Sequence, residues 1–437
     1  MTQRDDSGRL GLVLTGGGAR CAYQVGALKA IAEWMPRGCP VPFQVLTGTS
    51  AGAVSATVLA SRAADFRGAM VGLEDVWAHF EVSDVFKSDT VSMLRAGLHW
   101  LLAFISSGML LPTPRSLLDN SPLRALLERT VVFRGIRRSI AQGRLHALGI
   151  CATGFTGGRS VTFYEGARGI EPWSRMTSTS QAVRLDLDNL MASLSIPFLF
   201  PPVQLKDDYY GDGAMRQAAP LSPAINLGAS RLLIIGVRGP SFRSAFGPME
   251  AARAPTPGQI FGYMLDTLFM DQIYADLEQL ERLNHLVQHA PASFAGVRSI
   301  KAMVLAPAVD LRAIAARHLT ELPRALRALL RLLGAQNTAA SSLASYLMFE
   351  AAYTRELMAL GYADAQARRE ELMDFIEPSQ HSAATPAPVR DLLKPASDLA
   401  SQQVHAAKTQ QRRESDHVGE GREDHTAGES RVDPQTL

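Results

Sequence analysis

One serine of this sequence stands where a nucleophile is typically found. Ser50 has glycine two positions away on each side, in Gly48-Thr49-Ser50-Ala51-Gly52, and an apolar stretch at residues 43–46 comes before it. A G-x-S-x-G pentapeptide typically forms a sharp turn from a strand to a helix, because Gly48 and Gly52 permit a strained backbone. Such a turn leaves the serine hydroxyl exposed, so the spacing predicts a nucleophile for acyl transfer at Ser50.

Two other glycine-rich segments supply the remaining groups that acyl transfer requires. Gly16-Gly17-Gly18-Ala19-Arg20 can present backbone N–H groups at a helix start, where they would stabilise a developing oxyanion. Asp212, in Gly211-Asp212-Gly213, offers a carboxylate that can accept the serine proton. We assign the oxyanion hole to Gly16, Gly17, Gly18 and Arg20. The supporting glycines are Gly48, Gly52 and Gly213.

Each of these segments also has a simpler interpretation. Small residues between a strand and a helix can serve tight packing alone. The glycine loop at 16–18 also resembles a dinucleotide-binding loop, but Cys21 stands where that fingerprint needs its last glycine. No acidic residue ends the next expected strand either, so an oxyanion loop explains the glycines better.

The general base that activates Ser50 is either Asp212 alone or a histidine oriented by Asp212. A triad in the chain order of α/β-hydrolases would join Ser50 and Asp212 to His285 or His289. These histidines are four apart in a helical stretch, which favours a helix surface. We therefore favour a Ser50–Asp212 dyad, which requires contact with the hydroxyl and burial to make the carboxylate a stronger base.

Arg20 falls at the start of the helix expected at residues 20–34, where a cation opposes the helix dipole. This placement indicates a role such as steering an anionic head group or bracing the loop. An ordinary surface arginine is the alternative.

The elements that must position these residues follow from the hydrophobic pattern. Strands are expected at 10–14 and 43–46, and helices at 20–34 and 51–61, an alternation typical of a parallel sheet. Later strands are expected at 146–153, 159–165, 231–237 and 301–305. Later helices are expected at 265–280, 319–333, 343–360 and 363–375.

Composition limits the class of protein. The chain has 437 residues, 46% of them hydrophobic, a net charge of +2 and three cysteines. We expect a cytoplasmic, globular protein without a signal peptide, transmembrane helix, metal site, cofactor or affinity for nucleic acid. The apolar stretch 91–111 either lines an acyl pocket or is a core helix. Arg312, Arg317, Arg324, Arg327 and Arg331 either form a basic face for peripheral membrane contact or a solvated helix face.

Four blocks together resemble the patatin-like phospholipase family. They are the loop 16–20 with residues 23–27, the elbow 48–53, the block 192–202 and Asp212-Gly213-Ala214. The resemblance implies a three-layer α/β/α fold with a mainly parallel central sheet and additional C-terminal helices. It also implies a Ser50–Asp212 dyad and lipid acyl hydrolysis without a metal. Cys21 and Ala214 replace glycines that are usual in the family, and neither change removes a catalytic group.

These observations predict four segments: a flexible N-terminus at 1–9, a catalytic core at 10–225, further strands and helices at 226–377 and a disordered tail at 378–437. The predicted function is a serine hydrolase that cleaves fatty-acyl esters of phospholipids through an acyl-enzyme. The alternatives are a carboxylesterase or lysophospholipase acting on smaller lipids, or a low-turnover scaffold at membranes.

Overall fold

The computed structural model describes residues 8–89, 115–239, 254, 256–289, 298–334 and 341–378, and residues 91, 92, 95, 97–99, 102 and 106. Most of the predicted N-terminal segment, nearly all of the predicted tail and most of the apolar stretch 91–111 therefore lie outside the described residues.

A mixed sheet forms the centre of the molecule. Its main path runs β5-β4-β3-β2-β1-β8-β9, and β7 pairs with both β3 and β6. The five strands from β3 to β9 on this path are parallel to one another, whereas β4 and β7 run antiparallel to β3. The strands are β1 Leu10–Leu14, β2 Val45–Thr49, β3 Ala147–Gly154, β4 Arg159–Gly166, β5 Ser178–Ala182, β6 Val203–Leu205, β7 Asp208–Asp212, β8 Arg231–Ile235 and β9 Lys301–Leu305.

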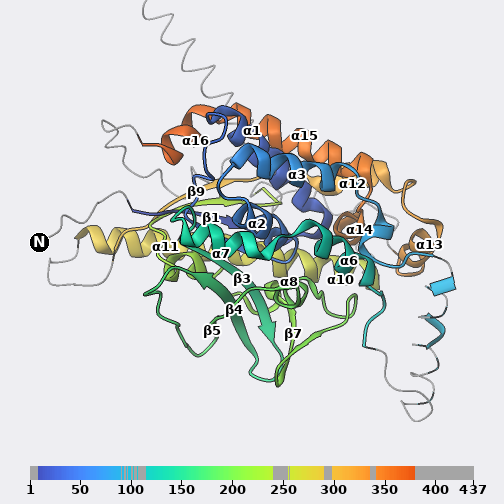
Figure 1. The fold of residues 1–437 in the computed structure, drawn as a ribbon. Coiled ribbons are helices and arrows are strands. Elements are labelled where there is room, and N and C mark those ends of the chain that lie inside the picture. The colour runs from blue at the N-terminus through green and yellow to red at the C-terminus, as the bar shows by residue number, and fades with distance from the viewer. Residues whose placement is uncertain are drawn as a thin grey trace, which may run out of the picture.

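Helices cover both faces of this sheet (Figure 1). They are α1 Ala22–Trp34, α2 Ala51–Ser61, α3 Phe66–Ala78, α4 Val82–Val85, α6 Ser121–Thr130, α7 Phe133–Ala141, α8 Leu187–Leu194, α9 Ser222–Asn226, α10 Pro257–Asp266, α11 Gln272–His289, α12 Leu311–His318, α13 Arg324–Leu332, α14 Ser341–Leu347, α15 Ala351–Ala367 and α16 Arg369–Ile376. Short helical turns lie at Gly18–Cys21 and Gly213–Arg216, and a π-helical turn, Thr267–Asp271, joins α10 to α11.

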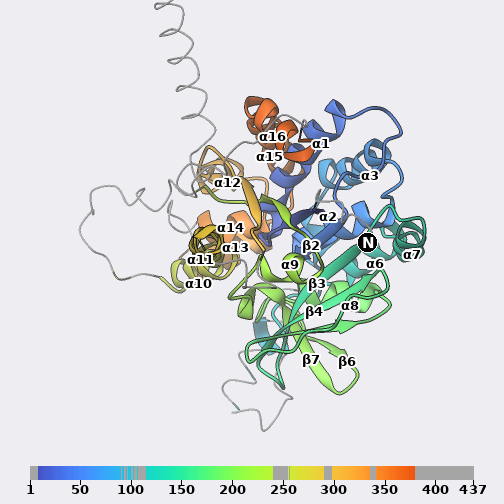
Figure 2. The same ribbon diagram turned by 90° about the vertical axis from the view of Figure 1, so that its left-hand side faces the viewer.

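The alternation of side chains along the strands divides the core into two layers. Leu12 and Leu14 of β1 belong to the cluster that includes α1, α2 and α3, whereas Val13 belongs to the cluster that includes α9 and α11. In Figure 2, α1 and α11 lie on opposite sides of the strands. Because both faces of a mainly parallel sheet are covered, its strands are apolar on both faces. This arrangement confirms the predicted three-layer α/β/α fold.

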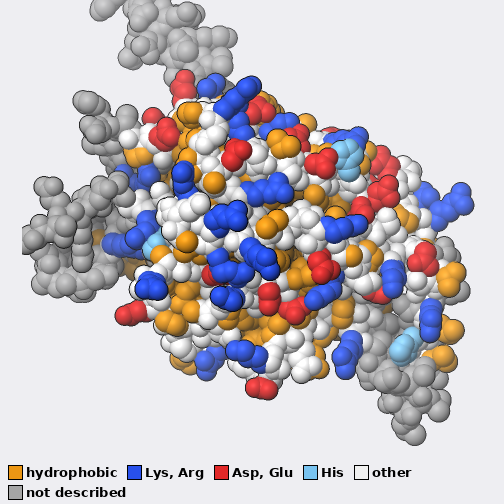
Figure 3. All heavy atoms as spheres, in the orientation of Figure 1, with side chains coloured by type: hydrophobic (Ala, Val, Ile, Leu, Met, Phe, Trp, Pro, Cys, Tyr) orange, Lys and Arg blue, Asp and Glu red, His pale blue; other side chains and the backbone are white. Residues whose placement is uncertain are grey.

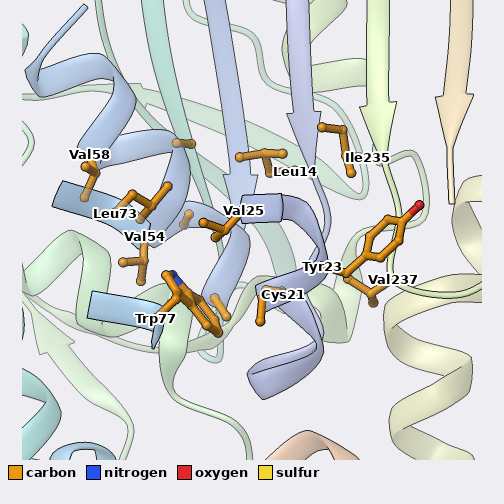
Figure 4. Close-up of a cluster of buried hydrophobic side chains, with 14 of the residues drawn as sticks. Leu14, Cys21, Tyr23, Val25, Val54, Val58, Leu73, Trp77, Ile235 and Val237 are labelled. Carbon is orange, nitrogen blue, oxygen red and sulfur yellow. The ribbon is translucent and has the colours of Figure 1, made fainter. Parts of the chain in front are cut away.

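The helical layer formed by α1, α2 and α3 packs apolar side chains against the sheet. Figure 4 shows Val25 of α1, Val54 of α2 and Trp77 of α3 beside the strands that carry Leu14 and Ile235. All of these side chains are buried. On the face in Figure 3, Lys and Arg side chains lie among Asp, Glu and hydrophobic side chains, so that face carries no field of a single sign.

Several element boundaries differ from the predicted ones. The helix expected at 343–360 is two helices, α14 and α15, and the helix expected at 265–280 is interrupted by the π-helical turn. The helix expected at 319–333 begins only at Arg324, because Pro323 precedes it as the N-cap. Two short strands, β5 and β6, were not predicted. Both lie near the edge of the sheet and lack a strong apolar pattern.

Candidate active site

Ser50 occupies the turn between β2 and α2 in a strained conformation. Its φ is 53° and its ψ is −132°, which is unusual for a residue with a side chain. The flanking glycines make the turn possible: a Cβ on Gly48 would lie 2.4 Å from Ala53 Cα, and one on Gly52 would lie 2.5 Å from the carbonyl oxygens of Leu14 and Thr15. The G-x-S-x-G pentapeptide is therefore required by close backbone contacts.

A buried serine from a distant helix holds this turn. The Ser50 N–H donates to Ser193 Oγ at 2.9 Å, and the Ser193 hydroxyl donates to the Cys151 carbonyl oxygen at 2.6 Å. Ser193 lies in α8, and Cys151 lies in β3. The two hydrogen bonds connect the serine turn to the next parallel strand. Ser193 falls within the motif block 192–202, although the sequence alone did not indicate its role.

The glycine loop after β1 approaches Ser50 closely. A Cβ on Gly16 would lie 3.1 Å from Ser50 Cβ and 2.5 Å from the ring of Phe269. Gly18 has a φ of +55°, and a Cβ there would lie 2.3 Å from the Tyr346 carbonyl oxygen. The loop therefore needs glycine both for its conformation and for its contacts. Its end forms the helical turn Gly18–Cys21, whose first N–H groups have no helical partner by geometry.

Asp212 ends β7 and is almost completely buried. The Asp212 backbone N–H donates to the Ser195 carbonyl oxygen at 2.8 Å, and Thr153 Oγ1 donates to the Asp212 carbonyl oxygen at 2.8 Å. Asp212 Oδ1 accepts from the Ala214 N–H at 3.0 Å, whereas Oδ2 has no hydrogen-bond partner of regular geometry. These contacts fix the backbone and one carboxylate oxygen and leave the other oxygen without a hydrogen bond of regular geometry.

Burial changes the acidity of this carboxyl. Burial raises the pKa of Asp212 to about 7, although hydrogen bonding from the Ser50 side chain and from the Ala214 N–H acts in the opposite direction. The Ser50 hydroxyl thus lies close enough to stabilise the carboxylate. No histidine is among the groups that set this pKa. The structure places the Ser50 side chain next to the Asp212 carboxyl, whereas His285 is exposed on α11.

Comparison with protein families places the segment that holds these residues. Residues 12–225 match the family model described as Patatin-like phospholipase. This part of the chain belongs to the patatin-like phospholipase family. The chain is accordingly a lipid acyl hydrolase by class, and the predicted resemblance is confirmed.

Solved structures of low identity resemble the patatin-like chain. VipD from Legionella pneumophila is 12% identical, with 91% of this chain and 82% of that chain covered and a TM-score of 0.30. Human GIVD cytosolic phospholipase A2 is 14% identical, with 86% of this chain and 60% of that chain covered and a TM-score of 0.38. A chain of the Pseudomonas aeruginosa complex of SpcU with ExoU is 17% identical, with 92% and 90% covered and a TM-score of 0.25. No curated protein sequence matches the chain.

Arg20 of the patatin-like domain is buried, so the interpretation as a surface arginine is wrong. Its guanidinium donates to Asp266 Oδ1 and to Ser345 Oγ, each at 2.8 Å, and lies 3.9 Å from the centre of the Tyr346 ring. Its backbone N–H donates to the Gly17 carbonyl oxygen at 3.2 Å. These contacts tie the glycine loop to α10 and α14, which corresponds to the bracing role considered from the sequence. They also occupy the backbone N–H and the guanidinium of Arg20, so its assignment as an oxyanion donor is wrong.

The site is closed to solvent in this conformation. Ser50 is 2% exposed and Asp212 is 1% exposed, so the expectation that the turn exposes the serine hydroxyl is wrong. Phe269, from the π-helical turn, packs over Gly16 beside Ser50. The neighbouring cavity, which Gly16, Thr49 and Phe269 line but Ser50 and Asp212 do not, has a volume of about 20 Å³, which is room for about one water molecule. An acyl chain needs a wider opening than this.

Within the described residues no group of three or more His, Cys, Asp and Glu side chains is arranged to hold a metal ion. None of the helices within these residues combines the length and the hydropathy needed to cross a bilayer.

Proposed function

We propose that the chain hydrolyses fatty-acyl ester bonds of phospholipids, with Ser50 as the nucleophile and Asp212 as the general base. One observation carries the proposal: the buried carboxylate of Asp212, with one oxygen free of any regular hydrogen bond, interacts with the side chain of Ser50, which is held in a strained turn. A carboxyl with a pKa of about 7 is a far stronger base than an exposed aspartate, and it is partly ionised near neutral pH. This makes direct proton transfer from the serine feasible without a histidine.

The first half of the reaction forms an acyl-enzyme. Ser50 Oγ attacks the ester carbonyl carbon while Asp212 takes the hydroxyl proton, which gives a tetrahedral intermediate. The carbon–oxygen bond to the alcohol then breaks, and Asp212 returns the proton to the departing oxygen. A lysophospholipid leaves, and the acyl group remains on Ser50.

The second half releases the fatty acid. Water attacks the acyl-enzyme carbonyl, and Asp212 accepts a proton from that water. Ser50 Oγ then departs and recovers the proton from Asp212, so that the enzyme returns to its starting state. The same carboxylate thus serves both halves, which requires that it stays within reach of both the serine and the water.

Backbone N–H groups of the glycine loop are the proposed oxyanion donors. Gly17 and Gly18 begin a helical turn next to Ser50, so their N–H groups are available to a negatively charged oxygen. The N–H of Ala51, at the start of α2, is a further donor. The loss of one such donor raises the barrier by about 3 kcal/mol. Arg20 acts indirectly here, by holding the loop that carries the donors.

The test measures fatty-acid release in the presence of EDTA. The substrates are mixed phosphatidylcholine and phosphatidylglycerol vesicles and p-nitrophenyl butyrate, and the variants are Ser50→Ala and Asp212→Asn. We expect both variants to lose at least about 10³-fold in kcat on both substrates.

The matched control is Asp208→Asn, at the other end of β7. Burial raises the pKa of Asp208, but hydrogen bonds from Thr156 outweigh it and keep the pKa below its usual range. We expect this variant to retain activity within about twofold. Release that persists in Ser50→Ala, or that survives in Asp212→Asn at neutral pH, would contradict the dyad. Release from the soluble ester but not from vesicles would indicate a carboxylesterase instead.

A further inference from the structure

Helix α10 exposes apolar side chains and buries its charged one, which is the reverse of an ordinary surface helix. Its outward side chains are apolar: Ile260 is 48% exposed, Tyr263 is 66% exposed and Met264 is 47% exposed. They lie three and four positions apart, so they share one face of the helix. The single charged residue of α10, Asp266, is instead buried against Arg20. A helix that only meets water would place the charge outside and the apolar residues inside.

A basic helix touches the beginning of α10. The Gly258 N–H donates to the Leu333 carbonyl oxygen at 2.8 Å, so the end of α13 contacts the start of α10 (Figure 2). Leu332, next to this contact, is 84% exposed. Arg324 and Arg331 of α13 are exposed and Arg327 is half-buried. Within the described part of the chain no carboxylate forms an ion pair with these three arginines.

The other arginines that the sequence grouped with them behave differently. Arg312 and Arg317 lie on α12, a separate helix. Arg312 pairs with Asp310 at 2.7 Å, and Arg317 pairs with Glu356. Their charges are thus neutralised within the protein, and the available positive charge of this region lies on α13 beside the apolar face of α10.

The same helix is connected to the closed site. Its last residue, Asp266, binds Arg20 of the glycine loop, and the π-helical turn that follows carries Phe269 over Gly16. A displacement of α10 would therefore move the side chain that packs beside Ser50. Phe269, which must move to open the site, and the exposed apolar face of α10 therefore belong to one continuous segment of the chain.

We propose that Ile260, Tyr263 and Met264 of α10, together with Arg324, Arg327 and Arg331 of α13, dock the protein onto an anionic lipid bilayer. This inference rests on the proposed function, because it names the form in which the phospholipid is met. Apolar side chains enter the boundary between head groups and acyl chains, while neighbouring arginines attract anionic head groups. The combination of both on adjoining helices suits a bilayer better than a second copy of this net-cationic surface.

The binding test uses the Ser50→Ala variant, so that the vesicles stay intact. Co-sedimentation is measured with vesicles of phosphatidylcholine alone and of phosphatidylcholine with phosphatidylglycerol. Into this background we introduce Ile260→Ser, Tyr263→Ser and Met264→Ser together, and Tyr263→Ser alone as a milder variant. The matched control is Val71→Ser with Met176→Ser, which removes apolar side chains that are 68% and 94% exposed elsewhere on the chain.

We expect the triple variant to bind anionic vesicles at least about tenfold more weakly than the parent, and the control to bind as the parent does. Tyr263→Ser alone should fall between the two. Binding that is equal in parent, single and triple variants, or absent in the parent, would overturn the proposal. Equal far-ultraviolet circular dichroism and melting temperatures verify that the variants are folded. Should the triple variant fail to fold, Tyr263→Ser against the control decides the matter.

The charge arm replaces Arg324, Arg327 and Arg331 by glutamine. Each arginine near an anionic surface strengthens binding by about fivefold, so the preference for phosphatidylglycerol should fall steeply and the remaining binding should lose its salt dependence. An unchanged preference would refute the role of α13. Sedimentation velocity compares the mass of the parent with that of the apolar triple variant. A parent that is a dimer and a triple variant that is a monomer would assign the face to self-association and overturn the bilayer proposal.

These outcomes are separable from the proposed function. Hydrolysis of p-nitrophenyl butyrate by the wild-type chain tests the catalytic groups without any bilayer. If the chain hydrolyses that ester but binds vesicles equally well with and without the α10 substitutions, only the proposed docking surface is refuted. Vesicle binding that depends on α10 in a chain without esterase activity supports docking and removes the hydrolase mechanism.

Discussion

Replacing Asp212 by asparagine tests the buried base through stability as well as through activity. The carboxyl of Asp212 has an ordinary pKa of 3.8, which burial raises to about 7 in the folded chain. Between these two values the folded state holds a proton that the unfolded state has released. The free energy of unfolding must therefore fall as the pH rises from about 4 to about 7, and it must level off above that range.

The size of this effect follows from the difference between the two pKa values. A difference of about 3 pH units, at 1.36 kcal/mol for each unit, gives an upper bound of about 4 kcal/mol. Asparagine has nearly the same shape, accepts the Ala214 N–H in the same way and does not ionise. The Asp212→Asn variant should therefore gain stability relative to wild type by up to about 4 kcal/mol between pH 4 and pH 8.

Urea unfolding at pH 4, 5, 6, 7 and 8 measures this gain, and initial rates on p-nitrophenyl butyrate measure the activity beside it. We expect kcat/KM of wild type to rise with pH up to about 7 and then to level off, as the carboxyl becomes ionised. Asp208→Asn serves as the control, because the pKa of Asp208 is lowered rather than raised. Unfolding curves of wild type and Asp212→Asn that stay parallel over this pH range would refute the reasoning.

Two further substitutions test the turn and the loop. Ser193→Ala leaves the buried N–H of Ser50 without an acceptor, so we expect a loss of about 1–3 kcal/mol in urea unfolding and a fall in kcat that exceeds any change in KM. A kcat equal to that of wild type would show that the strained turn needs no such support. Gly18→Ala would place a Cβ 2.3 Å from the Tyr346 carbonyl oxygen at a positive φ, whereas Gly38→Ala has a positive φ with open space around it. In urea unfolding we expect Gly38→Ala to lower the free energy of unfolding by about 1–2 kcal/mol and Gly18→Ala to lower it clearly more. Equal losses in the two variants would contradict the close contact at Gly18.

The candidate site was predictable where its residues are marked by glycine. Gly48 and Gly52 are fixed by contacts with their immediate backbone surroundings, so the pentapeptide itself indicated the turn. The glycine after Asp212 is fixed in the same way, since a Cβ on Gly213 would lie 2.3 Å from the Cys151 carbonyl oxygen. Short apolar strands between such markers also indicated the parallel sheet. Local constraints leave local signals in a sequence.

The partners of these residues were not predictable, because they come from distant parts of the chain. Ser193 is an ordinary small residue in a helix until the fold places it against Ser50, 143 positions away. Phe269 looks like one more apolar residue of a helix face, and only the π-helical turn carries it over Gly16. Neither hydrophobic periodicity nor spacing contains such long-range pairings.

Arg20 shows how a local conflict in the sequence can be settled by tertiary structure. A cation at a helix start is unfavourable on local grounds, but Arg20 sits in a short helical turn before α1 and its charge is opposed by Asp266 at 2.8 Å. A buried ion pair contributes little net stability, since desolvation of both charges offsets their attraction, whereas removal of one partner is costly. An apolar pair of similar volume would pack these elements together equally well. It would not present donors in one fixed plane to Asp266 of α10 and to Ser342 and Ser345 of α14. The geometry of the guanidinium, more than its energy, therefore explains why a charge is buried behind the glycine loop.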